Sequence, residues 1–519
     1  MFGIGGTSRL MFYSAAMLSW LAGVEGGAAQ TAPASQQHLE LLRWPLPAEA
    51  SAYAGIDGKH IWRHVEEQAQ ISRRYRDSGN PQFWGRLAGT SADVESAQWM
   101  LAKYREIGLT DTRIQTVKYY RPLWRAKSWA VSATADGKTI DLSSAQPTES
   151  SPTAELDTEV VYVGLGSESD FAERDVKGKA ILFIKETPGY NAGAAAAHNR
   201  AKGRGAAAIF VTDMRGGNYK VQSYRTSTDL PTFHLGTQDA MALRELIAGG
   251  GPAPRVRIRL DTEELLNQES YIVWGTLPGQ TDETIYVLAH RDGYFDAAGD
   301  NASGVATVLA LAEHFAKVPL SQRRRTMVFL GMDGHHSRPG GYGREWLVAN
   351  RARFFSKTAL IINAEHPAQV LTYGGATGGT NSSIPMDWYA GGASRPNLES
   401  ISANAFSEFG VPLWSKPSQT PPGGELLRFY WFLPGVVAQS NDYIMMHTEA
   451  DSPAAVSWTG LEASTRAFAK IIDEVNKLPL RELERPAGPD PAQPDGPRGY
   501  LSFKNCEAWL RDSSNTCVQ

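Results

Sequence analysis

Cysteine is almost absent from this chain of 519 residues, which contains only Cys506 and Cys517. No histidine and no third cysteine lies near this pair, so a small disulfide loop is favoured over a metal site if the chain is exported. In a reducing compartment the two residues would remain thiols.

An excess of charge of one sign is also absent. The chain has 51 Lys and Arg against 55 Asp and Glu, which gives a net charge of −4. This near balance gives no indication of a nucleic-acid partner or of an acidic lipid surface. The hydrophobic fraction of 42% is ordinary for a globular protein, and the length predicts two or more domains.

A long hydrophobic run is the third missing feature. The apolar stretch at residues 10–24 is too short and too interrupted for a confident membrane span. Because Arg9 precedes this stretch and small residues follow it, the pattern predicts a cleaved secretory signal over residues 1–29. We therefore expect export to the periplasm or the exterior, with no membrane span in the mature chain. An uncleaved membrane anchor is the alternative.

The rest of the chain divides by the period of its apolar residues. Residues 40–150 are predicted to be the N-terminal part of a catalytic domain, with helical spacing in their first half. The segment at 158–260 is predicted to be a self-contained β-rich insert that ends near a Gly-Gly-Gly-Pro turn. Residues 265–480 are predicted to complete the catalytic domain, and the Pro/Gly-rich residues 481–519 to form a loose extension.

Strand-like and helical patterns alternate after residue 270. Apolar runs of strand length are separated by a strongly apolar helical stretch at 301–318, and a long helical stretch follows at 459–478. This alternation predicts an α/β fold with a mainly parallel sheet that is covered by helices on both faces.

Residue types that bind metals follow the predicted strands. They are His290 with Asp292 behind the first run, Asp300 before the next helix, the pair His335-His336, Glu365, and His447. Ligands of open α/β sheets gather at the carboxyl ends of strands, so we expect these side chains to converge. Each alone could be a structural histidine, a helix cap or a turn residue, but together they suit zinc or a similar divalent ion.

Several of these stretches resemble the co-catalytic zinc exopeptidases, a family that includes bacterial aminopeptidases and glutamate carboxypeptidases. The most specific stretch is AAGDNASGVATVLALA, which is similar to the family's Asp-Asn-Ala-Ser-Gly element. VLAHRD resembles the family's strand end with His-x-Asp, and HTEAD resembles its closing His-Thr-x-x-Asp. The resemblance covers roughly residues 60–125 and 265–475, and the insert at 158–260 resembles a protease-associated domain.

The resemblance also implies roles for single residues. Asp300 is expected to bridge two metals, and Asp292 to orient His290 through a hydrogen bond. The expected ligand sets are Asp300, His290 and Glu365 for one metal, and Asp300, His336 and His447 for the other.

Two stretches depart from the family's pattern. The family has two adjacent glutamates, a general base and a metal ligand, where this chain has His335-His336. The family often has Ser-Asp-His where this chain has GGELL at 423–427. A neutral imidazole is still a good zinc ligand, so His336 is expected to bind metal. An imidazole is also a competent base near neutral pH, so His335 is expected to accept the proton of the attacking water.

These expectations describe a metal-dependent hydrolase of the aminopeptidase or carboxypeptidase type, in which metal-activated water attacks an amide or peptide bond. The expected cofactor is one or two zinc ions, and another divalent metal such as iron would also suit the histidine-rich set. The expected partner is a peptide or a small amide substrate. A metal enzyme of another class, such as a lyase or an iron-dependent enzyme, and a catalytically inactive binding protein on the same fold are the alternatives.

Overall fold

The computed structural model describes residues 45–119, 122–185, 192–222, 228–336, 342–368, 387–390, 396–411, 422–430, 432–439 and 445–483. The expected secretory signal, the two cysteines and nearly all of the C-terminal extension lie outside these residues. Within the described part of the chain, no helix combines the length and the apolar character needed to cross a membrane.

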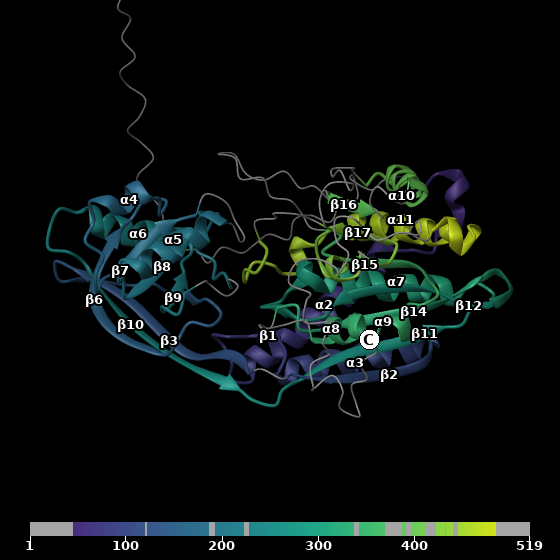
Figure 1. Cartoon of the computed structure of the whole chain (residues 1–519), viewed down its shortest axis with the longest axis horizontal. Coiled ribbons are helices and arrows are strands. Elements are labelled where there is room, and N and C mark those ends of the chain that lie inside the picture. The colour runs from purple at the N-terminus through teal and green to yellow at the C-terminus, as the bar shows by residue number, and fades with distance from the viewer. Residues whose placement is uncertain are drawn as a thin grey trace, which may run out of the picture. The chain divides into compact units, whose positions relative to one another are not determined.

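The first sheet belongs to the predicted catalytic domain and has the strand order β16-β17-β15-β12-β14-β11-β2 among the described residues (Figure 1). Its strands are β2 (Thr110–Lys118), β11 (Glu269–Leu277), β12 (Thr281–His290), β14 (Arg325–Met332), β15 (Thr358–Ala364), β16 (Asp387–Ala390) and β17 (Gly435–Gln439). The four central strands β14, β12, β15 and β17 are parallel. The outer strands β11, β2 and β16 pair antiparallel. The expectation of a mainly parallel sheet is thus corrected to a mixed sheet, because residue patterns predict strands but not the direction in which edge strands pair.

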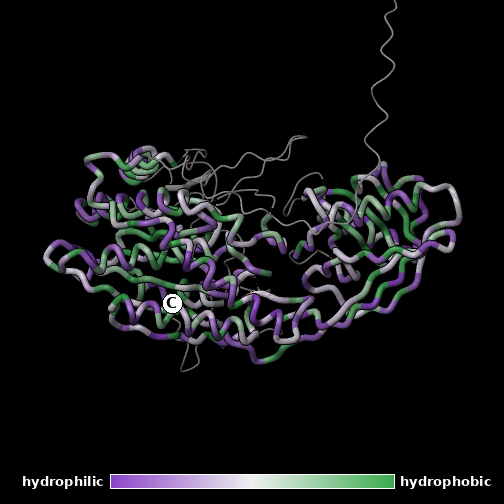
Figure 2. Tube along the Cα trace, turned by 180° about the vertical axis from the view of Figure 1, so that it is seen from behind, coloured by the Kyte–Doolittle hydropathy of each residue, from purple (hydrophilic) through white to green (hydrophobic). Residues whose placement is uncertain are grey.

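Helices cover both faces of this sheet. One face carries α2 (Gly58–Asp77), α3 (Ser91–Ile107), α7 (Gly304–Ala316), α10 (Pro396–Glu408) and α11 (Trp458–Lys477), and the other carries α8 (Tyr342–Ala349) and α9 (Arg351–Phe354). The alternation along β12 explains this arrangement: Val287 packs into the first core, whereas Tyr286 and Leu288 pack into the second. Figure 2 shows hydrophobic stretches gathered where strands and helices face each other.

The second sheet has the strand order β4-β3-β10-β6-β7-β8-β9-β5. Its strands are β3 (Leu123–Ala135), β4 (Lys138–Asp141), β5 (Gln146–Pro147), β6 (Ala154–Tyr162), β7 (Ala180–Ile184), β8 (Ala208–Thr212), β9 (Thr232–His234) and β10 (Arg255–Leu265). Helices α4 (Glu168–Ala172), α5 (Ala192–Gly203) and α6 (Thr237–Ala248) accompany it. Strands β6 to β9 are parallel, so this region is α/β in character rather than purely β-rich.

The boundaries of the second sheet differ from those predicted for the insert. The sequence predicts that residues 40–150, which include 123–147, belong to the catalytic domain and that the insert begins at 158. In the structure β3 pairs antiparallel with β10, and the β3–β4 hairpin therefore belongs to the second sheet. A period-two pattern identifies a strand, but it does not show which distant strand will be its partner.

The short elements complete the description. They are η1 (Ala48–Tyr53), η2 (Ala298–Ser303), η3 (Leu320–Gln322), η4 (Glu425–Arg428), η5 (Pro453–Ala455), η6 (Leu480–Glu482), and the paired strands β1 (Gly85–Arg86) and β13 (Gly293–Tyr294). Two of them lie at the carboxyl edge of the first sheet: η2 leads into α7, and η4 carries a buried glutamate.

Candidate metal centre

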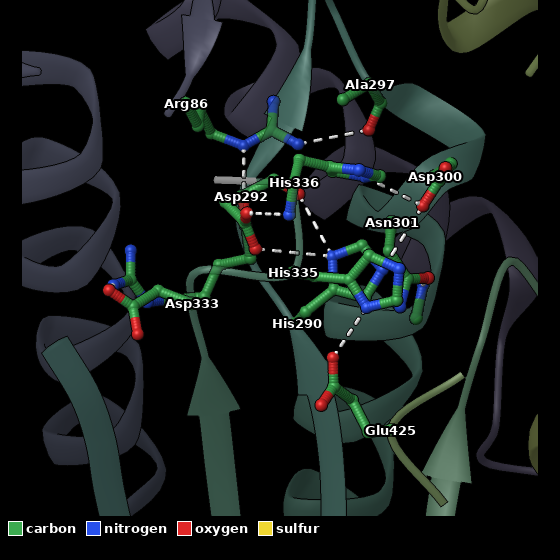
Figure 3. A network of polar contacts seen from close by, with 12 residues as sticks. Arg86, His290, Asp292, Ala297, Asp300, Asn301, Asp333, His335, His336 and Glu425 are labelled. Carbon is green, nitrogen blue, oxygen red and sulfur yellow. Dashed lines mark hydrogen bonds and ion pairs between the residues drawn. The ribbon is translucent and has the colours of Figure 1, made fainter. Parts of the chain in front are cut away.

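Asp300 occupies the centre of the site. Its backbone N–H and that of Gly299 donate hydrogen bonds to the carboxylate of Asp451, at 3.1 and 2.8 Å, which fixes the η2 turn before α7. Three imidazoles contact its side chain, and two of them, His290 and His336, are labelled in Figure 3. Oδ1 lies 3.2 Å from His290 Nε2 and 3.3 Å from His336 Nε2, and Oδ2 lies 3.1 Å from His447 Nε2.

A second carboxylate reaches the same place from β15. Glu365 Oε1 lies 3.1 Å from His290 Nε2, and Asn363 Nδ2 donates to Glu365 Oε2 at 3.1 Å. Both His290 and Glu365 are almost completely buried. The five residues expected to bind metal, namely His290, Asp300, His336, Glu365 and His447, are therefore brought together.

The spacing of these atoms fits a metal ion. Ligands that lie 2.0–2.2 Å from a tetrahedral zinc are about 3.3 Å from one another. The nitrogen–oxygen separations around Asp300 are 3.1, 3.2 and 3.3 Å. One ligand atom each from His290, Asp300 and His336 forms a group within 4.8 Å. The donor set of imidazole and carboxylate suits zinc, so the residues present fit the group that the sequence implied.

The expected division of the ligands into two sets stays a prediction. The ring centroid of His336 lies 4.8 Å from that of His447, with which the sequence paired it, and His336 also shares Asp300 Oδ1 with His290. Two further groups lie within 4.8 Å: His290, His335 and Glu365, and Asp300, Glu365 and His366. Spacing along the chain cannot decide such pairing, because it depends on how the loops at the strand ends turn.

Asp292 does more than the resemblance implied. His290 Nδ1 lies 3.0 Å from the Asp292 carbonyl oxygen and 3.5 Å from its Oδ1. The other carboxylate oxygen accepts a hydrogen bond from the backbone N–H of His336 at 2.7 Å. Burial alone would raise the pKa of Asp292, but contacts with His290 and His336 lower it to about 2. This carboxylate thus ties the loop of one expected ligand to the ring of another.

His335 lies on the rim of this cluster and has a different partner. Its ring stacks on that of His290, with centroids 4.2 Å apart. Its Nδ1 lies 2.7 Å from Glu425 Oε1, and Arg344 contacts the same carboxylate through Nη1 at 3.1 Å and Nε at 3.0 Å. Glu425 is completely buried, and burial raises its pKa to about 7 against the opposing effect of Arg344.

The electrostatics favour an ionised carboxylate at the centre, and the pKa values of two flanking imidazoles shift in opposite directions. Burial alone would lower the pKa of His290, but contacts with Glu365, Asp292 and Asp300 raise it well above its usual value. Burial alone would raise the pKa of Asp300, but the imidazoles, His336 first, hold it well below its usual value. Burial lowers the pKa of His447 to about 4. Neutral imidazole and ionised carboxylate are the forms in which these side chains bind metals.

The loop that carries His447 is contacted by residues of the second sheet's region. Arg215 Nη1 donates to the Met446 carbonyl at 2.6 Å, and the Gln222 N–H donates to the His447 carbonyl at 2.9 Å. Val221 and Thr448 form an isolated antiparallel bridge. His447 itself adopts a positive φ of 60°, a conformation that is uncommon for residues other than glycine. These contacts hold an expected ligand in a backbone conformation that is otherwise unfavourable.

A comparison with known protein families finds a match over the part of the chain that contains this site. Residues 273–472 match Peptidase family M28. This M28-like region contains every expected metal ligand, and the match confirms the predicted class, a metallo-exopeptidase-like hydrolase. No curated protein matches the chain.

Solved structures show the same fold at low sequence identity. A zinc aminopeptidase from Bacillus subtilis is 18% identical, with a TM-score of 0.57, and the match covers 81% of this chain and 95% of that one. An M28 peptidase precursor from Shewanella amazonensis is 18% identical, with a TM-score of 0.61 and coverages of 83% and 100%. An aminopeptidase from Aneurinibacillus is 16% identical, with a TM-score of 0.52 and coverages of 85% and 97%. The predicted α/β exopeptidase-type fold is confirmed at this level.

Sequence reasoning missed two parts of the site. GGELL at 423–427 was recognised as a departure from the family's pattern, but its glutamate was given no role, because nothing in the sequence shows that it faces His335. Arg344 has no detectable motif and is found only because α8 follows the His335-His336 loop. Asp451, in contrast, stands in the HTEAD stretch, so its contact with the Asp300 backbone could have been anticipated.

Proposed function

We propose that the M28-like region is a zinc-dependent exopeptidase that cleaves a peptide end or a small amide. The observation that carries the proposal is the position of Asp300, whose two carboxylate oxygens lie within 3.3 Å of three imidazole nitrogens. A carboxylate in this position can bridge two ions. The aminopeptidases that share this fold support a peptide substrate.

The ligand roles follow from the contacts. His290 and His336 would bind one zinc ion with Asp300 Oδ1, and His447 would bind a second ion at Asp300 Oδ2. Glu365, whose Oε1 lies 3.1 Å from His290 Nε2, would complete the first set. A bound zinc ion would supply Lewis-acid activation of water and of the substrate carbonyl.

His335 would act as the general base in this proposal. In this proposal the ionised carboxylate of Glu425, fixed by Arg344, accepts a hydrogen bond from the Nδ1–H of His335, whose Nδ1 lies 2.7 Å from Glu425 Oε1. This bond leaves His335 Nε2 without a proton, and that nitrogen would accept the proton of the attacking water. The family's paired glutamates place a carboxylate directly at this point. Here a histidine takes the position, and a carboxylate from a different segment orients it.

The histidine-rich centre could bind a metal other than zinc. His290, His336 and Asp300 form a set of two histidines and one carboxylate, which also suits iron(II). The hydrolytic class favours zinc, and elemental analysis of purified protein decides between the two metals. Iron in place of zinc would favour the alternative of a metal enzyme of another class.

Two further parts of the proposal concern the rest of the chain. The region of the second sheet would act as a protease-associated type of insert that supports the His447 loop. The chain would be exported after removal of residues 1–29. N-terminal sequencing of protein from its native host tests the second point, since a mature chain that begins at Met1 would contradict it.

The proposal is tested with an aminoacyl-amide and dipeptide panel, combined with zinc analysis. Zinc-loaded wild type should hydrolyse at least one substrate of the panel, and chelation should abolish the activity. Retention of zinc without hydrolysis of any panel member would favour the alternative of an inactive binding protein.

A further inference from the structure

A second group of metal-binding side chains lies outside the Asp300 centre, between helices α2 and α7. It consists of His60 and His64 on α2 and Glu313 on α7, and one ligand atom of each lies within 4.8 Å of the others. His60 Nε2 lies 2.8 Å from Glu313 Oε2, and His64 Nε2 lies 3.2 Å from Glu313 Oε1. None of these residues takes part in the function proposed above.

The local sequence explains why the two histidines meet. They stand four residues apart on one helix, the spacing at which two side chains share a face and reach the same ion. Their ring centroids are 5.0 Å apart. Glu313 projects from α7, which packs against α2. The three donors are therefore presented by two rigid helices rather than by a loop.

The surroundings leave room for an ion and its remaining ligands. The three residues line a cavity of about 460 Å³, together with Lys103, Glu106 and Lys317. The side chain of His60 is 40% exposed, whereas that of His64 is only 5% exposed. An ion can thus enter from solvent and still be held by a buried donor. Three protein ligands with an open fourth position is an arrangement that zinc accepts.

We propose that His60, His64 and Glu313 form a second, peripheral zinc-type site that links α2 to α7. Two imidazoles and a carboxylate select zinc or a similar transition metal over magnesium, which prefers oxygen ligands. The ion joins α2 to α7, and α2 also contacts the η2 turn that leads into α7 at the Asp300 centre, where Gln68 Nε2 donates to the Ala302 carbonyl at 3.1 Å. Its effect is to stabilise the packing of these helices.

The neighbouring Arg63 provides a separate test of the proposal. Arg63 Nη2 lies 3.0 Å from His60 Nδ1 and donates a hydrogen bond to it. When Nε2 of a neutral imidazole binds a metal, Nδ1 carries the proton and can no longer accept a bond from Arg63. The exposed Arg63 must then turn away. Arg63→Ala should therefore tighten zinc binding, a result that a hydrogen-bonded cluster with no metal does not predict.

The test uses the full chain with zinc alone as the probe, in an Asp300→Asn background that disables the first centre. Zinc per chain is measured after dialysis, and the thermal unfolding midpoint is measured with and without zinc. Addition of His60→Gln should remove one zinc ion per chain and reduce the rise in the midpoint. Glu313→Gln should do the same, and Glu106→Gln, which alters the same cavity outside the group, should not. Magnesium should not raise the midpoint.

The readout is independent of peptidase activity, so failure of the proposed function would not affect it. With an intact Asp300 centre, His60→Gln should leave turnover unchanged at saturating zinc. Equal zinc content with and without His60→Gln, or weaker binding in Arg63→Ala, would show that the three residues form only a hydrogen-bonded cluster.

Discussion

The two sheets of this chain both collect charged residues at the ends of parallel strands, but with opposite results. In the first sheet, Asp300 and Glu365 face imidazoles, and the donors converge at distances that suit a metal. In the second sheet, β8 ends beside Asp213, whose carboxylate contacts Lys185 at 3.6 Å, Arg215 at 2.8 Å and His234 at 3.5 Å. There a single buried carboxylate is already neutralised by protein cations.

The difference shows that strand-end position alone does not define a metal site. A guanidinium or an ammonium cannot bind a metal, and it supplies the positive charge that an ion would otherwise bring. Imidazole can donate a lone pair, so a cluster of carboxylate and imidazole leaves that charge to be supplied from outside. The first cluster is accordingly suited to chemistry, whereas the second anchors Arg215, which contacts the His447 loop.

The largest expected effect comes from exchanging the central carboxylate in each cluster. Asp300→Asn should lose the metal of the Asp300 centre and reduce turnover to background, because both oxygens of Asp300 face imidazole nitrogens. Asp213→Asn should retain the ligands of the metal but lower the free energy of unfolding by about 3–5 kcal/mol, because it removes the buried carboxylate that balances the charges of Lys185 and Arg215. Metal analysis and denaturant unfolding of both variants check this contrast. A stable Asp213→Asn protein, or a fully active Asp300→Asn protein, would remove the distinction between the clusters.

The next effect separates the two adjacent histidines. His335→Ala should keep its metal while turnover falls by about 100- to 10,000-fold, the range expected for loss of a general base. Turnover is measured on a substrate that wild type accepts, with zinc content determined on the same sample. Because His335 also lies within 4.8 Å of His290 and Glu365, loss of metal in this variant would identify it as a ligand instead.

A smaller effect is expected behind His335. Glu425→Gln should reduce turnover by about 10- to 100-fold, since the amide no longer fixes the proton on His335 Nδ1. Only the ionised carboxylate sets this tautomer, and burial raises the pKa of Glu425 to about 7. Wild-type activity should therefore rise with pH through about 7, and this dependence should disappear in Glu425→Gln. A pH profile that is unchanged by the substitution would show that Glu425 does not orient the base.

The sequence predicted which side chains come together at the site better than it predicted their arrangement. The Asp-Asn-Ala-Ser-Gly element and the strand-ending His290 are local patterns, so Asp300 and its partners could be named in advance. The contact between His335 and Glu425 joins residues 90 positions apart, and no local pattern encodes it. The same reason explains the misplaced β3–β4 hairpin, whose partner β10 lies more than a hundred residues further along the chain.

The smallest expected effect concerns the contact between the second sheet's region and the His447 loop. Arg215→Met removes the bond to the Met446 carbonyl and should weaken zinc binding by about three- to tenfold, as expected for one lost hydrogen bond. Zinc titration of this variant checks the effect. Arg259→Met, at a side chain that is 61% exposed, serves as the control and should bind zinc like wild type. Equal affinity in all three proteins would mean that the loop is held without Arg215.

The central claim is that a metal is bound around Asp300 by histidines that include His336. The most direct test measures zinc content per chain in two proteins. One carries Glu313→Gln alone, so that the peripheral group does not contribute, and the other carries Glu313→Gln together with His336→Ala. The single variant should bind zinc at a fixed number of ions per chain and hydrolyse a substrate of the panel. The double variant should lose at least one ion per chain together with the activity. Equal zinc content in the two proteins would contradict the role of His336, and absence of zinc from both would contradict the metal centre itself.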